Sequence, residues 1–372
     1  MKTTSGSGIF GEVTAKLGEN MNRNRFECWL AGVLLMTVMS GSAFAADTPA
    51  RSAEAEQKVV VAHRGASAYL PEHTLPAVAM AYAMGAEYME QDVIMTRDDQ
   101  LIVWHDLTLE RTTDVAERFP ERARENGSFY VIDFDLDELR QLRLTEGFRL
   151  DEHGEQVSNY PSRFPLWQSR FQVHTLAEQI EMVQGMNHST GQDIGIYPEI
   201  KSPVFHREHG KDISTAMVRE LKRFGYTSKD DPIFLQTFDF DELRRVHDEI
   251  FPAEGVELPL IQLIGGGAAY QWMLEPDGVE EVARYADGLG PHYSLIIDDD
   301  SSMDNLIITD LVPLAHQHGM EVHPYTFRAD EGMVPPYARD FEHMLELFYF
   351  EADVDGVFTD FPDRVVDFLR AR

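Results

Sequence analysis

Cysteine and basic residues are scarce in this sequence of 372 residues. Its single cysteine, Cys28, excludes a disulfide within the chain, so an ordinary apolar core must hold the fold together. Lysine and arginine number 32 against 64 aspartates and glutamates, which gives a formal net charge of −32. Binding to nucleic acid needs a basic surface, and we therefore expect no nucleic-acid partner.

Long apolar runs are lacking too. The run from Trp29 to Met39 falls short of the ~20 apolar residues that a transmembrane helix needs, and no later run approaches that length. A basic stretch from Met21 precedes this run, and the small-x-small pattern Ala43-Phe44-Ala45 follows it. This order predicts a cleaved signal peptide over residues 1–45, with Met21 as an alternative start, and a mobile segment over 46–57. We expect an exported protein without stable membrane insertion.

From Lys58 onward, short β-branched runs alternate with amphipathic helical patterns. This alternation is typical of βα units around a parallel sheet. Eight or nine strands are expected of a (β/α)8 TIM barrel, in which the last short piece serves only to close the chain. The predicted strands are 59–63, 88–93, 101–105, 194–200, 233–237, 258–263, 288–290, 321–325 and 356–359.

Helix signals and one long interruption complete the domain plan. Thr74 is a candidate N-cap for a helix that ends at Gly85, a capping box begins at Thr175, and another helix runs from about Ile213 to Gly225. Residues 107–173 are rich in charged residues, show weak periodicity and are too many for an ordinary loop. We predict a small inserted subdomain over one end of a barrel domain that spans 58–372.

Two carboxylates, Glu90 and Asp92, lie within the second predicted strand and are separated by one residue. In a strand they face the same side, and two like charges so close resist joint ionisation unless a cation lies between them. A divalent metal would resolve the conflict, and oxygen ligands favour Ca²⁺ or Mg²⁺ over zinc. For an isolated pair, ordinary surface acids on a solvated strand edge would be the preferred interpretation.

Other predicted strands also end in polar residues. A turn at 96–100 would fold the chain back, so that the strands before and after it pair in antiparallel fashion. If the numbers of paired residues sum to about 197, Asp92 lies beside His105. Barrel enzymes assemble their sites at this end of the strands. The set suggests a metal and cationic groups that hold a phosphate, with one histidine taking a proton and the other giving one. Its members are the carboxylates Glu90, Asp92 and Glu199, the imidazoles His63 and His105, the cations Arg64 and Lys201, the amide Gln236, and the aromatics Tyr69, Phe238, Tyr325 and Phe327; His174, His206, His292 and His323 stay unassigned.

The ordered motifs of the chain resemble the glycerophosphodiester phosphodiesterase family. They are "AHRGASAYLPEHTLPA", "EQDVIMTRDD", "VWHDLTLERTTD", "YPEIKSP", "LQTFD", "ADGLGP", "VHPYTFR" and "DGVFTDFPD". The resemblance implies a barrel of the phosphatidylinositol-phospholipase-C-like type with a small insertion. It also implies His63 and His105 as the acid/base pair, Glu90, Asp92 and Glu199 as metal ligands, and Arg64 and Lys201 as phosphate contacts.

The resemblance departs from the family pattern at one position. The common P-E-N-T reads Pro71-Glu72-His73-Thr74 here, which leaves Glu72 as an acid that braces the site and the role of His73 open. Phe238, Tyr325 and Phe327 would line the pocket for glycerol or alcohol, although packing at the end of the barrel is an equal alternative for each. Glu72 and Gln236 join them as expected substrate-side residues.

The implied activity is metal-dependent hydrolysis of glycerophosphodiesters such as glycerophosphocholine and glycerophosphoethanolamine to sn-glycerol 3-phosphate and an alcohol. We expect a periplasmic enzyme with a small-molecule substrate and one divalent cation, Ca²⁺ in the first place and Mg²⁺ as the alternative. A cyclic intermediate or direct attack by water, a homodimer, and the role of the insertion stay open. The rival functions are a phospholipase-D-like activity on intact lipids and a binding protein without turnover.

Overall fold

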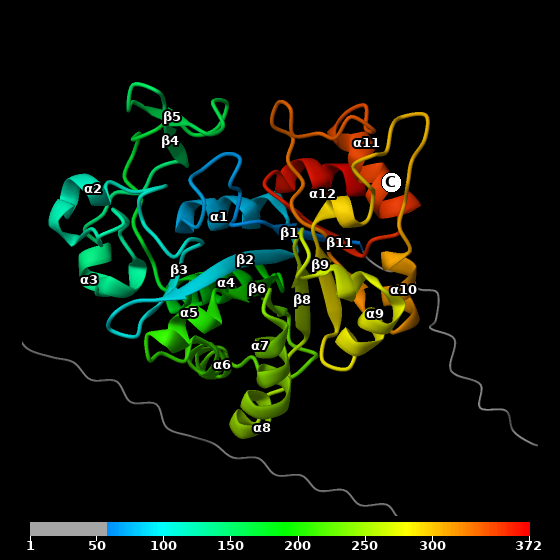
Figure 1. Cartoon of the computed structure of the whole chain (residues 1–372), viewed down its shortest axis with the longest axis horizontal. Coiled ribbons are helices and arrows are strands. Elements are labelled where there is room, and N and C mark those ends of the chain that lie inside the picture. The colour runs from blue at the N-terminus through cyan, green and yellow to red at the C-terminus, as the bar shows by residue number, and fades with distance from the viewer. Residues whose placement is uncertain (1–57) are drawn as a thin grey trace, which may run out of the picture. The chain divides into compact units, whose positions relative to one another are not determined.

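Eight parallel strands form the centre of the structure, a computed structural model that describes residues 58–372 (Figure 1). Their order in the sheet is β10-β9-β8-β7-β6-β2-β1-β11, and a ninth strand, β3, pairs with β2. The predicted signal peptide, 1–45, and the segment 46–57 lie outside the described residues. The strands of the sheet are β1 (Val59–Ala62), β2 (Tyr88–Met95), β3 (Leu101–Val103), β6 (Gly195–Ile200), β7 (Leu235–Thr237), β8 (Leu260–Ile264), β9 (Gly288–Pro291), β10 (Glu321–Val322) and β11 (Gly356–Thr359).

The segment that follows β10 closes the sheet into a barrel. The Phe327 amide donates to the Phe358 carbonyl at 2.8 Å, and the Phe358 amide donates to the Pro324 carbonyl at 3.0 Å. On its other side, the Tyr325 amide donates to the Pro291 carbonyl at 3.0 Å. Both neighbours of this segment are thereby joined, so the predicted (β/α)8 barrel is confirmed.

Two details of the predicted sheet were wrong. The strand outside the barrel is β3, which runs antiparallel to β2, whereas the last strand, β11, pairs with β1 along its whole length. The β2–β3 register pairs Val93 with Val103, a sum of 196, so Asp92 lies opposite Trp104, with His105 one residue further on. The turn occupies residues 96–100 as predicted, and within it Asp99 adopts a left-handed conformation, with φ 61°.

The helices that surround the sheet begin and end at the expected signals. The Thr74 side chain accepts a hydrogen bond from the Ala77 amide, Gly85 ends the first helix at φ 89°, and Thr175 forms a capping box with Glu178. Between residues 58 and 372, no helix is long and apolar enough to cross a membrane. The α-helices are α1 (Leu75–Met84), α2 (Val115–Arg118), α3 (Leu136–Leu139), α4 (Leu176–Thr190), α5 (Pro203–Glu208), α6 (Ile213–Arg223), α7 (Phe240–Arg245), α8 (Phe251–Glu254), α9 (Pro276–Val282), α10 (Leu311–Gln317), α11 (Phe341–Glu346) and α12 (Pro362–Arg370), with π-helical turns at Val246–Ile250 and Leu347–Glu351 and short 3₁₀ turns elsewhere.

Alternate residues of each strand face the interior of the barrel. In β6, Ile196 and Ile200 pack outward in the core shared with the helices. Tyr197 points inward and is fully buried in an interior cluster with Val61, Ile261 and Phe358. Glu199 has the same parity as Tyr197, so its carboxylate lies two residues further toward the carboxyl end of the barrel interior.

Residues 107–173 form short elements around a hydrophobic cluster of their own. They include α2, α3 and a two-stranded hairpin of β4 (Phe148–Leu150) and β5 (Gln156–Ser158), which Figure 1 shows beyond the end of β3. Their cluster contains Leu109, Phe134 and Leu144, and it continues into the main sheet through Ile94 and Ile102. This apolar continuity packs the segment firmly against the β2–β3 hairpin.

We predict that Gly195→Ala lowers the free energy of unfolding by about 1–3 kcal/mol, because an added Cβ has no room. It would lie 2.4 Å from the Tyr88 ring and 2.7 Å from the Pro232 carbonyl oxygen. Gly185→Ala is the matched control, since Gly185 lies in α4 with nothing within 4 Å of its added Cβ. Helix propensity should make that variant slightly more stable. Urea unfolding measures both, and equal stabilities would contradict the close packing at Gly195.

Candidate active site

A cavity of about 200 Å³ opens at the carboxyl ends of the barrel strands. It contains most of the residues that the sequence singled out, brought together from the ends of β1, β2, β3, β6 and β7 and from the segment after β10. The lining residues are His63, Arg64, Glu90, Asp92, His105, Glu199, Lys201, Gln236, Phe238, Leu263, His292, Tyr325, Thr326, Arg328 and Phe358.

Three buried carboxylates form the floor of this cavity. Glu90 and Asp92 are each 2% exposed, and Glu199 lies directly beside Asp92 in the β2–β6 register. Lys201 Nζ lies 3.1 Å from Glu199 Oε1 and 3.4 Å from Asp92 Oδ1. Arg64 contributes its backbone amide, which donates to Glu90 Oε2 at 2.7 Å. Five charged groups therefore meet in one buried cluster.

The pKa values of the three carboxylates shift in different directions. Burial raises the pKa of Glu90 well above its usual range, and the neighbouring Asp92 adds to the effect. Burial also raises the pKa of Glu199 to about 8, against the opposing influence of Lys201. For Asp92, Lys201, His105 and His73 outweigh burial and hold its pKa well below the usual range.

His73, whose role the sequence left open, belongs to this cluster. Its Nε2 atom lies 2.7 Å from Asp92 Oδ2, and its side chain is 2% exposed. One ligand atom each from His73, Glu90 and Asp92 lie within 4.8 Å of one another, a grouping that could hold a metal ion. The backbone of His73 is left-handed, with φ 53°, a conformation in which histidine and asparagine are both enriched.

His63 is held by a carboxylate that follows the last strand. Its Nδ1 atom lies 2.7 Å from Asp360 Oδ1, while Asp360 Oδ2 accepts hydrogen bonds from Arg163 Nη2 at 2.6 Å and Arg328 Nε at 2.7 Å. Burial, assisted by Arg64, lowers the pKa of His63 to about 4, so the free imidazole is neutral at pH 7. The bond to Asp360 places the Nδ1 proton there and leaves Nε2 as the unprotonated nitrogen.

His105 has a parallel arrangement. Its Nδ1 atom lies 2.5 Å from Asp106 Oδ1, and Arg111 Nε donates to Asp106 Oδ2. Burial and Arg64 lower the pKa of His105. Arg111 also donates to Glu72, which in turn accepts from Arg64 Nη1 at 3.0 Å. Glu72 lies outside the wall of the 200 Å³ cavity and contacts the site through Arg64, as a bracing acid does.

The aromatic residues divide into two groups. Phe238 and Tyr325 line the cavity with ring centroids 5.8 Å apart, and Gln236 lies beside them, 2% exposed, opposite Glu199 in the register. Phe327 was a wrong prediction, because it is fully buried on the other side of the strand and packs against Phe348. Regular pairing of β10 ends at Val322, so the alternation of faces no longer holds at 327.

Several lining residues were missed. His292 and Arg328 line the cavity, and Asp360 holds His63 from outside its wall. All three follow the last three strand segments, where the strand-end rule that selected His63 also applies. Thr326 lines the cavity between Tyr325 and Arg328. Tyr69 lies elsewhere, where its hydroxyl donates to Asp363 and its ring packs on Phe361.

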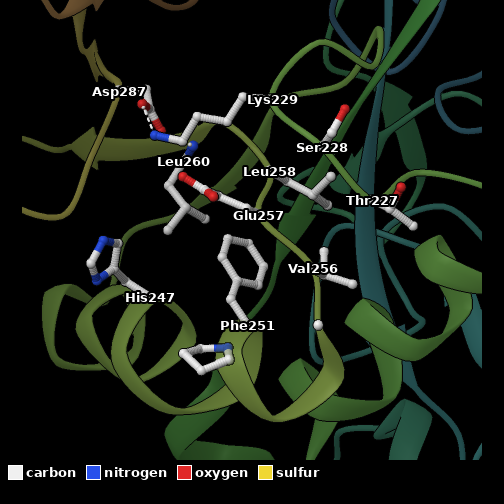
Figure 2. A pocket seen from close by; sticks show the side chains of 12 residues that line it. Thr227, Ser228, Lys229, His247, Phe251, Val256, Glu257, Leu258, Leu260 and Asp287 are labelled. Atoms are coloured by element: carbon white, nitrogen blue, oxygen red, sulfur yellow. Dashed lines mark hydrogen bonds and ion pairs between the residues drawn. The ribbon is translucent and has the colours of Figure 1, made fainter.

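A larger cavity, of about 570 Å³, lies at the opposite end of the barrel (Figure 2). Its wall includes Lys229, Leu258 and Asp287, which precede β7, β8 and β9 and therefore lie at the amino ends of the strands. Lys229 and Asp287 form an ion pair across it. Size alone would select this cavity, but the convergence of acids, bases and cations selects the smaller one as the active site.

The fold and the cavity of about 200 Å³ define a (β/α)8-barrel enzyme with its active site at the carboxyl ends of the strands. Comparison with known proteins identifies the family. Residues 63–364 match the Glycerophosphoryl diester phosphodiesterase family. The glycerophosphodiester phosphodiesterase of Haemophilus influenzae is 43% identical, covering 91% of this chain and 97% of that protein. The enzyme of the same name from Treponema pallidum is 38% identical, covering 85% and 92%.

The chain therefore belongs to the glycerophosphoryl diester phosphodiesterase family and is a phosphoric diester hydrolase. A solved structure supports the fold assignment. It is a phosphodiesterase from Oleispira antarctica in complex with the product sn-glycerol-3-phosphate, which matches with a TM-score of 0.55 and 21% identity, covering 84% of this chain and 97% of that one.

We predict that Arg163→Ala destabilises the fold by about 3 kcal/mol, because it removes the partner of two buried carboxylates. Arg163 is 5% exposed and pairs with Asp330 and Asp360, which are 4% and 2% exposed. Arg97→Ala is the control: Arg97 and its partner Asp135 are 49% and 39% exposed, so that variant should unfold at nearly the wild-type urea concentration. Similar midpoints for both variants would contradict the structural importance of the Arg163 pairs.

Proposed function

We propose that the enzyme hydrolyses the glycerophosphodiesters left by phospholipid deacylation, such as glycerophosphocholine and glycerophosphoethanolamine, to sn-glycerol 3-phosphate and an alcohol, and that it needs one divalent cation. The observation that carries the proposal is the meeting of two carboxylate-held histidines with three buried carboxylates and two cations in one cavity. The product bound to the Oleispira antarctica phosphodiesterase agrees with this substrate class.

Arg64 and Lys201 are the groups that would bind the phosphate. Both line the cavity and both are largely buried, so their attraction for a phosphate anion is little screened by water. Glu72 and Asp92 hold the Arg64 guanidinium, with Asp92 Oδ2 3.4 Å from its Nε atom. A guanidinium fixed in this way is ready to receive the substrate without reorganisation.

The two histidines would divide the proton transfers. A neutral imidazole whose Nδ1–H donates a hydrogen bond to a carboxylate can accept a proton at Nε2 from the attacking hydroxyl. That hydroxyl belongs either to the substrate glycerol or to water. The other imidazole, once protonated, can donate a proton to the oxygen of the departing alcohol. The phosphodiester anion favours this protonated form, because a nearby negative charge raises the pKa of an imidazole.

The carboxylate cluster fits a hard divalent cation. Glu90, Asp92 and Glu199 offer oxygen ligands, and His73 would orient Asp92 through its 2.7 Å contact. Burial, together with the neighbouring Asp92, raises the pKa values of Glu90 and Glu199, so the charged form of these carboxyl groups would be favoured by a bound cation. When bound, the cation would supply Lewis-acid stabilisation of the negative charge on the phosphate oxygens. This donor set supports Ca²⁺ first and Mg²⁺ second.

Removal of metal should abolish activity, because the carboxylate cluster without a cation repels a phosphodiester. We expect a chelator to reduce release of sn-glycerol 3-phosphate from glycerophosphocholine to background, and excess Ca²⁺ or Mg²⁺ to restore it. A chelated enzyme that retains full turnover would exclude the cation from the mechanism. A folded enzyme that shows no turnover with any added cation would instead favour a binding protein.

His63→Ala and His105→Ala should each reduce kcat by about 10²–10⁴-fold while leaving the protein folded, since each removes one proton-transfer group. His153→Ala serves as the control, because that histidine belongs to the 107–173 segment and is 75% exposed. Steady-state kinetics and circular dichroism report activity and folding. A kcat near that of the control for either variant would remove that histidine from the mechanism.

A further inference from the structure

A second cavity, of about 220 Å³, adjoins the active-site cavity on the side of the inserted segment. His63, Arg64 and Arg328 line both cavities, so the two meet at these residues. Glu146 and Tyr160 from the 107–173 segment form part of the remaining wall. The second cavity is therefore built jointly by the barrel and the insertion.

The two cavities diverge from the place where the substrate phosphate would bind. A phosphodiester has two arms, and each arm must leave the phosphate in its own direction. One cavity offers the rings of Phe238 and Tyr325, whereas the wall of the other is strongly polar. Both cavities adjoin His63 and Arg64, the residues beside which the substrate phosphate would bind.

One carboxyl group in the second cavity lacks the partners that its neighbours have. Glu72 is held by Arg64 and Arg111, and Asp360 is held by arginines as well. Glu146 is 6% exposed, and its Oε2 atom has no hydrogen-bond partner among the described residues. Burial raises the pKa of Glu146 to about 8, against the opposing influence of Arg163 and of the Gly147 backbone amide.

A buried carboxyl oxygen without a hydrogen-bond donor destabilises the fold, whereas a ligand that donates a hydrogen bond to it would compensate this cost. The alcohols released from glycerophosphodiesters differ in this respect. Ethanolamine carries N–H donors and glycerol carries O–H donors. The trimethylammonium group of choline has no donor at its cationic end, so it can only offer its charge.

We propose that the second cavity binds the alcohol half of the substrate and that Glu146 accepts a hydrogen bond from an N–H or O–H group of that alcohol. The inference rests on the proposed function and deepens it. Glu146 thereby selects glycerophosphodiesters whose alcohol has a donor at its far end, such as ethanolamine or glycerol, over the choline ester. The aromatic cavity is left for the glycerol that becomes glycerol 3-phosphate.

The test compares three substrates: glycerophosphoethanolamine, glycerophosphoglycerol and glycerophosphocholine. In Glu146→Ala, kcat/KM for the first two should fall about 10-fold relative to kcat/KM for the choline ester, because only they lose a hydrogen bond to a carboxylate. In Glu146→Gln, which keeps the shape and one acceptor oxygen, the ethanolamine ester should lose more than the glycerol ester. Thermal unfolding verifies that both variants are folded, and the Gln variant carries the test if the Ala variant does not fold.

Glu152→Ala is the matched control, since Glu152 lies in the same segment but its side chain is 86% exposed. Its three kcat/KM values should keep the wild-type ratios. Equal changes for all three substrates in the folded Glu146 variants, or no change in any, would overturn the assignment of this cavity. A wild-type enzyme that cleaves none of the three substrates would refute the proposed function itself, so the two failures are distinct.

Discussion

The structure depends on the compensation of buried charge at the carboxyl end of the barrel. Glu90, Asp92 and Glu199 all face inward because they alternate with outward residues, among them Met89, Val93 and Ile200, along two neighbouring strands. Only Lys201 and Arg64 are close enough to balance them within the described residues. The rest of the site follows from this constraint, since a cluster with more negative than positive charge attracts a cation, and a cation attracts a phosphate.

The same constraint explains why the 107–173 segment is part of the active site. Each catalytic imidazole is oriented by an aspartate, and each aspartate is held by an arginine from that segment: Arg163 on Asp360 and Arg111 on Asp106. An isolated buried aspartate would protonate and lose its hold on the imidazole. The insertion therefore supplies counter-charge to the barrel, and its second hydrophobic cluster keeps the arginines in place.

Sequence reasoning predicted the barrel and the centre of the site because both obey local rules. Parity along a strand places Glu90 with Asp92 and Glu199 with Lys201, and strand ends place His63 and His105. It missed Arg163 because the 107–173 segment has weak periodicity and because the bond to Asp360 joins residues 197 positions apart. For Phe327 the alternative of packing at the end of the barrel holds, and the sequence offers no local signal that separates it from Tyr325, since both follow the last regular pair of β10.

The role of His73 follows from the structure and not from the sequence pattern. The departure from the family pattern left the role of this position open, whereas the structure shows two properties there: a left-handed backbone and a nitrogen atom that reaches Asp92. Asparagine and histidine satisfy both. A donor on Asp92 matters because His73, with Lys201 and His105, offsets the effect of burial and keeps the pKa of this carboxylate well below its usual range. Histidine at position 73, where the family pattern has asparagine, therefore keeps a nitrogen atom on Asp92. This contact holds in place a carboxylate on which the proposed binding of both cation and phosphate depends.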